Sequence, residues 1–149
     1  MSGTAVLVDT GPLVAIVDQS DDAHESCINA LKLLSSSTQL VTTESVLTEA
    51  FHLISYVNGG SEKLFQLLRI FNAQLKPLAQ YQLKRVEELM SIYNDLPMDF
   101  ADATIVSTSE ELGIKTIFTL DRRGFDVYRP IHVKTFSLLP QEHTQKRKK

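Results

Sequence analysis

Short apolar runs alternate along this chain with segments whose apolar residues recur every three or four positions. Such alternation is typical of an α/β domain in which helices cover both faces of a mainly parallel sheet. We therefore predict a three-layer α/β/α architecture with a central, mainly parallel sheet. A length of 149 residues fits a single domain of this kind. We place that domain at residues 1–140 and expect the basic segment 141–149 to be disordered.

The apolar runs predict the strands, which are expected at residues 5–8, 40–43, 75–79, 116–119 and 131–133. Pro77 interrupts the third of these strands, so that strand belongs near an edge of the sheet. The helical spacing predicts helices over residues 12–18, 20–34, 44–57, 61–71, 81–93 and 99–112. Gly113 is expected to end the last of these helices.

The composition excludes several classes of protein. Hydrophobic residues make up 43% and charged residues 22% of the chain, which argues against disorder and against a coiled coil. No apolar run approaches the ~18 residues of a membrane span, and no signal peptide is recognisable, so we expect a cytoplasmic protein without a membrane partner. Cys27 is the only cysteine. An internal disulfide and a thiolate metal site are therefore excluded, and Cys27 should pack as a small apolar residue.

The net charge of −3 conceals an uneven distribution. Four of the 15 basic residues lie at 146–149, so residues 1–145 carry 11 basic against 18 acidic groups, a net charge of −7. An acidic body repels nucleic acid unless its charge is neutralised. The basic end admits two interpretations, a nucleic-acid contact or a solvated terminus. We favour the solvated terminus because no aromatic residues are interleaved with the charges.

Acidic residues fall where parallel strands are expected to end. Asp9 follows the first strand and Asp121 follows a later one, and ligands of α/β sheets collect at such carboxyl ends. Asp99 and Asp102 begin the helix that leads into that later strand, and their i, i+3 spacing places them on one side of it. Glu49 lies beside the apolar stripe of the helix after the second strand. We therefore expect these acids to meet at one edge of the sheet.

Each acid taken alone also fits a structural role. Asp9 fits a turn, Asp99 fits a helix N-cap and Glu49 fits a solvated helix surface. Together, however, two carboxylates ~4 Å apart repel each other by roughly 4 kcal/mol at an effective dielectric constant of 20, so a cluster needs a cation. Oxygen ligands without cysteine favour Mg²⁺ or Mn²⁺, and the scattered histidines argue against zinc. Such a site suits metal-assisted attack of water on a phosphodiester.

Four segments together carry a resemblance to a known family. They are Val6-Leu7-Val8-Asp9-Thr10, the helical segment 41–49 that ends in Glu49, Asp99-Phe100-Ala101-Asp102-Ala103, and Thr119-Leu120-Asp121. In order and spacing they look like a PIN domain and resemble the VapC-type ribonuclease toxins in particular, over roughly residues 5–133. The resemblance implies a Mg²⁺- or Mn²⁺-dependent endoribonuclease with RNA as its substrate, a homodimer, and a partner antitoxin protein.

The resemblance also implies roles for individual residues. Asp9, Glu49, Asp102 and Asp121 correspond to the metal-binding and catalytic acids. Thr10 corresponds to a hydroxyl that helps to position water or metal, although a hydroxyl at a helix start is an equal interpretation. Asp99 is a further acid near the metal. Arg122 and Arg123 are candidates for phosphate contact, with exposed turn residues as the alternative. The helix after Asp102 departs from the family by its polar residues, namely Thr104, Ser107, Thr108 and Ser109.

Other functions fit less well. A phosphatase of the haloacid dehalogenase type needs a second aspartate two residues after the first, and position 11 is glycine. A phospho-acceptor receiver domain needs an acidic pair near the first strand, whereas Asp9 is followed by Thr10. A catalytically inactive PIN-like module that binds nucleic acid or protein remains the second hypothesis. Metal dependence of thermal stability separates it from the nuclease.

Overall fold

The computed structural model describes residues 4–141. Its five strands are β1 (Ala5–Val8), β2 (Gln39–Thr42), β3 (Gln74–Leu75), β4 (Thr116–Phe118) and β5 (Ser137–Leu139). They form one sheet in the order β3-β2-β1-β4-β5, and every neighbouring pair is parallel. The predicted α/β class with a parallel sheet is confirmed. The two-residue strand β3 is indeed at an edge, ahead of Pro77.

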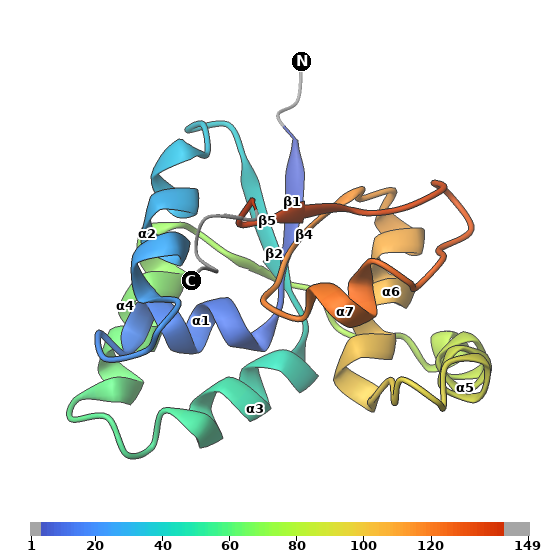
Figure 1. The fold of residues 1–149 in the computed structure, drawn as a ribbon, viewed down its shortest axis with the longest axis horizontal. Coiled ribbons are helices and arrows are strands. Elements are labelled where there is room, and N and C mark those ends of the chain that lie inside the picture. Colours follow the sequence, from blue (N-terminus) through green and yellow to red (C-terminus); the bar gives the residue numbers. More distant parts are fainter. Residues whose placement is uncertain (1–3, 142–149) are drawn as a thin grey trace, which may run out of the picture.

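Helices cover both faces of the sheet. They are α1 (Thr10–Val17), α2 (His24–Leu33), α3 (Glu44–Leu53), α4 (Gly60–Ile70), α5 (Leu83–Ile92), α6 (Phe100–Leu112) and α7 (Arg122–Phe125), with a 3₁₀ turn at Gln80–Gln82. Figure 1 shows α1, α2 and α4 on one side of the strands and α5 and α6 on the other. Helix α3 contacts both α1 and α6, so it joins the two helical layers beyond the carboxyl ends of the strands.

The core forms around the central strands. The side chains of Leu7, Ile117 and Phe118 are fully buried, as expected for neighbouring strands covered on both faces. The polar residues of α6 are buried too, namely Thr104, Ser107, Thr108 and Ser109. Thr104 and Ser109 each donate a hydrogen bond to a carbonyl three residues earlier in the helix. Both hydroxyls therefore find their hydrogen-bond acceptors within α6, which allows the helix to pack in the core.

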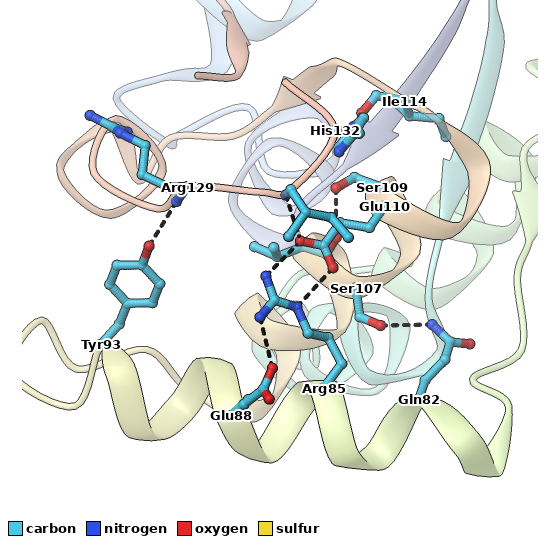
Figure 2. A network of polar contacts seen from close by, with 12 residues as sticks. Gln82, Arg85, Glu88, Tyr93, Ser107, Ser109, Glu110, Ile114, Arg129 and His132 are labelled. Atoms are coloured by element: carbon cyan, nitrogen blue, oxygen red, sulfur yellow. Dashed lines mark hydrogen bonds and ion pairs between the residues drawn. The ribbon is translucent and has the colours of Figure 1, made fainter. Parts of the chain in front are cut away.

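A polar network fixes α6 against α5. Arg85 donates two hydrogen bonds to Glu110, at 2.9 and 2.8 Å, and a third to Glu88 (Figure 2). The Ile131 amide also donates to Glu110, and Gln82 donates to Ser107. The Glu110 side chain is only 7% exposed, so its charge is compensated within the protein. The network sets the position of α6, whose first turn carries Asp102.

The prediction of a strand at residues 131–133 is wrong. Residues 131–133 lie in an irregular segment where Ile131 is 79% exposed and the His132 ring bonds to the Ile114 carbonyl at the end of α6. The fifth strand instead is β5, which pairs with β4 in the register Thr116↔Ser137 to Phe118↔Leu139. Residues 124–126 belong to the single helical turn α7 and its C-cap, and Phe125 is fully buried.

Cys27 is buried, as predicted, and burial raises the pKa of its thiol to about 11, which keeps it protonated. Within residues 4–141 no helix has the length and apolar character needed to cross a bilayer. The prediction of disorder for the basic terminus falls on residues 142–149, which lie outside the described residues.

Candidate functional site

An open cleft of about 560 Å³ lies where β1 and β4 end and α1, α6 and α7 begin. The acids that line it are Asp9, Asp21, Glu49, Asp99, Asp102 and Asp121. The structure thus brings together all four acids predicted to bind metal, together with Asp99. Asp21, in the turn between α1 and α2, is an addition that the sequence analysis did not find. The remaining lining residues of the described chain are uncharged, so the described lining places no basic side chain among these carboxylates.

Asp9 is the most buried acid of the cleft, at 7% exposure. It follows β1 in extended conformation and caps α1, because its Oδ1 accepts the Thr10 amide at 2.8 Å. Its Oδ2 accepts the Thr119 hydroxyl at 2.7 Å. Burial raises the pKa of Asp9 to about 6, opposed by these two hydrogen bonds and assisted by the charges of Asp121 and Asp99.

Thr119 is a site residue that the sequence analysis missed. It is fully buried just after β4, and its hydroxyl also accepts the Asp121 amide at 3.0 Å. One hydroxyl therefore orients both the acid that follows β1 and the acid that follows β4. The available signal was its position two residues before Asp121, but threonine is common in strands and the residue was assigned only to the strand.

Glu49 projects from α3 toward α1. Its Oε1 accepts the Thr10 hydroxyl at 3.1 Å, and that hydroxyl also lies 3.5 Å from the Val46 carbonyl. Thr10 does not cap its helix, since Asp9 provides the cap. Thr10 does stand at the helix start, as the first residue of α1, and a role of its hydroxyl toward water or metal stays a prediction. Its side chain positions an acid of the cleft.

Asp99 and Asp102 form a reciprocal cap at the start of α6. The Asp102 amide donates to Asp99 Oδ1 at 2.8 Å, and the Asp99 amide donates to Asp102 Oδ2 at 3.2 Å. The structural role of Asp99 as N-cap is thus observed, and Asp99 also lines the cleft. Burial raises the pKa of Asp102 to about 8, with further upward contributions from the charges of Asp99 and Asp9.

Asp121 begins α7, where its Oδ1 accepts the Gly124 amide at 3.1 Å. The two arginines that follow do not line the cleft. Arg122 donates from a guanidinium nitrogen to the Pro140 carbonyl at 2.8 Å, and Arg123 is exposed on the same helical turn. A phosphate contact by Arg122 or Arg123 stays a prediction.

The donor set fits a hard divalent ion. Within residues 4–141, Glu49 Oε2, Asp102 Oδ1 and Asp121 Oδ2 accept no hydrogen bond, while the other oxygen of each carboxylate is held by the protein. In the same range no group of three or more acidic, histidine or cysteine side chains is arranged so that it could hold a metal ion. Mg²⁺ is usually bound by one or two carboxylates and several waters, so an incomplete cage in an open cleft matches its chemistry.

Comparison with known proteins agrees with this architecture. Ribonuclease VapC26 of Mycobacterium tuberculosis is 26% identical over 137 residues, which cover 91% of this chain and 100% of that protein. The crystal structure of VapC20 of M. tuberculosis, a toxin that cleaves the sarcin-ricin loop, matches with a TM-score of 0.70 at 16% identity and covers 78% of this chain and 90% of its own.

VapBC2 from Rickettsia felis, solved with a DNA fragment from its promoter, matches with a TM-score of 0.67 at 18% identity. The match covers 91% of this chain and 97% of that one. At these identities the solved structures show the fold. The family model for the PIN domain matches residues 6–129, which span β1, α7 and everything between them. The chain therefore belongs to the PIN domain family.

Proposed function

We propose that this protein is a Mg²⁺- or Mn²⁺-dependent endoribonuclease. The observation that carries the proposal is the convergence of Asp9, Glu49, Asp102 and Asp121 on one cleft whose lining, within residues 4–141, includes no basic side chain. The raised pKa values of Asp9 and Asp102 are the signature of carboxylates held together in a partly buried place, which is typical of functional sites. Support comes also from VapC26, which is a ribonuclease.

Glu49, Asp102 and Asp121 would hold the ion through the carboxylate oxygens that accept no hydrogen bond within residues 4–141. Asp9 would share with the ion an oxygen that already accepts a hydrogen bond. Once bound, a divalent ion supplies positive charge that activates water and stabilises the oxygens of the phosphate. The chain itself supplies orientation. Thr119 and the Thr10 amide fix Asp9 from two sides, and Thr10 fixes Glu49. Oxygens held in this way need not reorganise when substrate and ion arrive.

Within the described lining no hydroxyl, thiol or imidazole is a candidate for covalent attack. Thr10 is the only hydroxyl residue of this lining and donates its proton to Glu49, and the described lining holds neither histidine nor cysteine. Water is therefore the nucleophile in this proposal, and the resemblance to the family implies a product with a 5′-phosphate. The uncharged part of the lining includes Leu53 and Leu120, both partly exposed, against which a sugar or base can rest.

We propose further that the protein is the toxin of a toxin–antitoxin pair. This rests on its likeness to VapC20 and to VapBC2, and not on a feature of the cleft alone. An antitoxin would close the acidic cleft, and a basic side chain inserted among the carboxylates would replace the charge of the ion. A homodimer is part of the same proposal. Co-purification with a small protein that blocks cleavage would support the pairing, and an uninhibited enzyme without such a partner would contradict it.

The direct test is cleavage of labelled RNA by the purified protein with Mg²⁺, with Mn²⁺ and with EDTA. We expect cleavage only with a divalent ion, and we expect Asp9→Asn to abolish it while the protein remains folded. Asp126→Asn is the matched control, because Asp126 is an exposed acid near Asp121 that does not line the cleft. Full cleavage by Asp9→Asn would overturn the assignment. Absence of both cleavage and metal-dependent stability would favour the inactive binding module.

A further inference from the structure

Tyr128 is a buried tyrosine that does not line the acidic cleft but whose hydroxyl contacts one of its acids. It is 1% exposed, and its ring packs edge-on against Tyr93 and Phe125, with ring centroids 5.0 Å apart in both pairs. Its hydroxyl lies 3.4 Å from Asp102 Oδ2. Within residues 4–141 this is its one hydrogen-bond partner. A buried tyrosine hydroxyl requires such a partner, so ring packing and polar contact together fix where the hydroxyl lies.

Gly124 makes room for that hydroxyl. A Cβ atom at position 124 would lie 2.7 Å from the Tyr128 hydroxyl oxygen, 2.9 Å from the adjoining ring carbon and 2.7 Å from Asp121 Oδ2. All three distances are shorter than nonbonded contacts allow. The Tyr128 ring is held by its aromatic neighbours and cannot retreat freely. Any residue larger than glycine would therefore displace the hydroxyl from Asp102, the carboxylate of Asp121, or both.

The hydroxyl decides which oxygen of Asp102 faces the cleft. Asp102 Oδ2 receives both the Asp99 amide and the Tyr128 hydroxyl, whereas Oδ1 receives no hydrogen bond within residues 4–141. The Gly124 amide has the same effect on Asp121. It donates a hydrogen bond to Oδ1, and Oδ2 accepts no hydrogen bond within residues 4–141. The two acids thus each present one oxygen that the protein has not occupied.

We propose that Tyr128 is a positioning residue for Asp102, and that Gly124 is required because it admits the Tyr128 hydroxyl between Asp102 and Asp121. The proposal rests on the proposed function, since the oxygen that Tyr128 leaves free is offered to the divalent ion. Partners that orient a metal ligand typically change metal affinity by about 10- to 100-fold. The contact of 3.4 Å is long for a hydrogen bond between oxygens, so we expect an effect near the lower end.

The test measures the dissociation constant of Mn²⁺ by electron paramagnetic resonance, at one fixed pH, for the full chain and four variants. Tyr128→Phe removes only the hydroxyl. Gly124→Ala keeps the hydroxyl but displaces it, and the double variant combines both changes. Tyr93→Phe is the matched control, because it removes one hydroxyl from the same aromatic cluster, where that hydroxyl accepts the Arg129 amide and contacts no acid. The free energy of unfolding in EDTA is measured alongside.

We expect Tyr128→Phe to weaken Mn²⁺ binding about tenfold and Gly124→Ala to weaken it at least as much. The double variant should bind no more weakly than Gly124→Ala, because both changes remove the same contact and their effects do not add. Tyr93→Phe should bind within about twofold of wild type even if it lowers the stability slightly. A structural role for the aromatic cluster would instead change the free energy of unfolding and leave the Mn²⁺ affinity alone.

Equal Mn²⁺ affinity for wild type and Tyr128→Phe would overturn this inference and leave the proposed function intact. Equal weakening by Tyr128→Phe and Tyr93→Phe would also overturn it, because the ring cluster and not the hydroxyl would then be responsible. If Tyr128→Phe fails to fold, Gly124→Ala keeps the inference falsifiable, because unchanged Mn²⁺ affinity of that variant would overturn it. Failure of wild type to bind Mn²⁺ would overturn the proposed function and this inference together.

Discussion

The Thr119 hydroxyl donates a hydrogen bond of 2.7 Å to Asp9 Oδ2, joining the end of β4 to the end of the neighbouring strand β1. The Thr119 hydroxyl oxygen also accepts the Asp121 amide, so one hydroxyl contacts two residues that lie 112 positions apart in the chain. The arrangement of the site therefore depends on one hydroxyl of the core.

Replacing that hydroxyl tests its importance. Thr119→Val keeps the shape of the side chain but removes the donor to Asp9 Oδ2 and the acceptor of the Asp121 amide. We expect the free energy of unfolding to fall by about 1–3 kcal/mol and cleavage of RNA to fall at least tenfold. Chemical denaturation and the cleavage assay measure the two effects. Thr119→Ser, which keeps the hydroxyl, should recover most of the activity.

Thr108 provides the control for this experiment. It is a buried threonine of α6 whose hydroxyl has no hydrogen-bond partner within the described chain. Thr108→Val should therefore leave stability unchanged or raise it, and cleavage should be unaffected. Equal losses for Thr119→Val and Thr108→Val would show that buried threonines matter here for packing and not for the acids.

The stability of the metal-free protein should fall as pH rises. Folding raises the pKa of Asp9 from 3.8 to about 6 and that of Asp102 to about 8, mainly by burial. A raised pKa means that the folded state favours the protonated acid. The stabilising contribution is complete below the unfolded value of 3.8 and is lost as pH rises through about 6 and then about 8.

Thermal unfolding in EDTA between pH 5 and pH 8.5 measures this loss. We expect Asp102→Asn to lose less stability than wild type over this interval, with a difference in Tm of roughly 5 °C at the alkaline end. The comparison between the two proteins cancels the titration of groups that they share. Parallel curves for wild type and Asp102→Asn would show that Asp102 ionises normally in the folded protein.

Mn²⁺ should reverse this loss of stability. A divalent ion binds the ionised carboxylates, so protons compete with it and its effect on Tm grows with pH. We expect a saturating concentration of Mn²⁺ to raise Tm by several degrees at pH 8 and by much less at pH 5. Asp126→Asn, which changes an acid outside the cleft, should respond as wild type does. An increase that is independent of pH would point to an ion bound elsewhere.

The pair formed by Arg85 and Glu110 should matter for stability. Arg85→Met removes the guanidinium and leaves the carboxylate of Glu110, which is 7% exposed, with only the Ile131 amide as a donor. We expect the free energy of unfolding to fall by about 2–4 kcal/mol, because an unpaired buried charge is costly. Glu88→Gln should change it by less than about 0.5 kcal/mol, since this partner of Arg85 is exposed. Chemical denaturation compares the two variants.

The sequence predicted the features that depend on local chemistry. Asp9 and Asp121 could be placed at one edge of the sheet because each follows a short apolar run, and parallel strands bring such ends together. Gly113 was predicted as a helix end and adopts the left-handed conformation there. The class of fold and the convergence of the acids follow from such periodic and terminal signals.

What the sequence did not reveal depends on contacts between distant segments. Strand β5 exists because its three residues pair with β4, whereas the more β-branched residues 131–133 lie across the end of α6. Thr119, Gly124 and Tyr128 carry ordinary local signals, namely a strand residue, a turn glycine and an aromatic residue. Their relation to the acids appears only once α6, α7 and β4 are packed together.

The central claim is that the four acids hold a divalent ion, and crystals grown or soaked with Mn²⁺ test it most directly. The account predicts anomalous density within the cleft, at coordination distances of about 2.0–2.2 Å from carboxylate oxygens of Asp9 and at least one of Glu49, Asp102 and Asp121. The density should be absent from crystals of Asp9→Asn prepared in the same way. A cleft without density at saturating Mn²⁺, or an ion bound only outside it, would contradict the account.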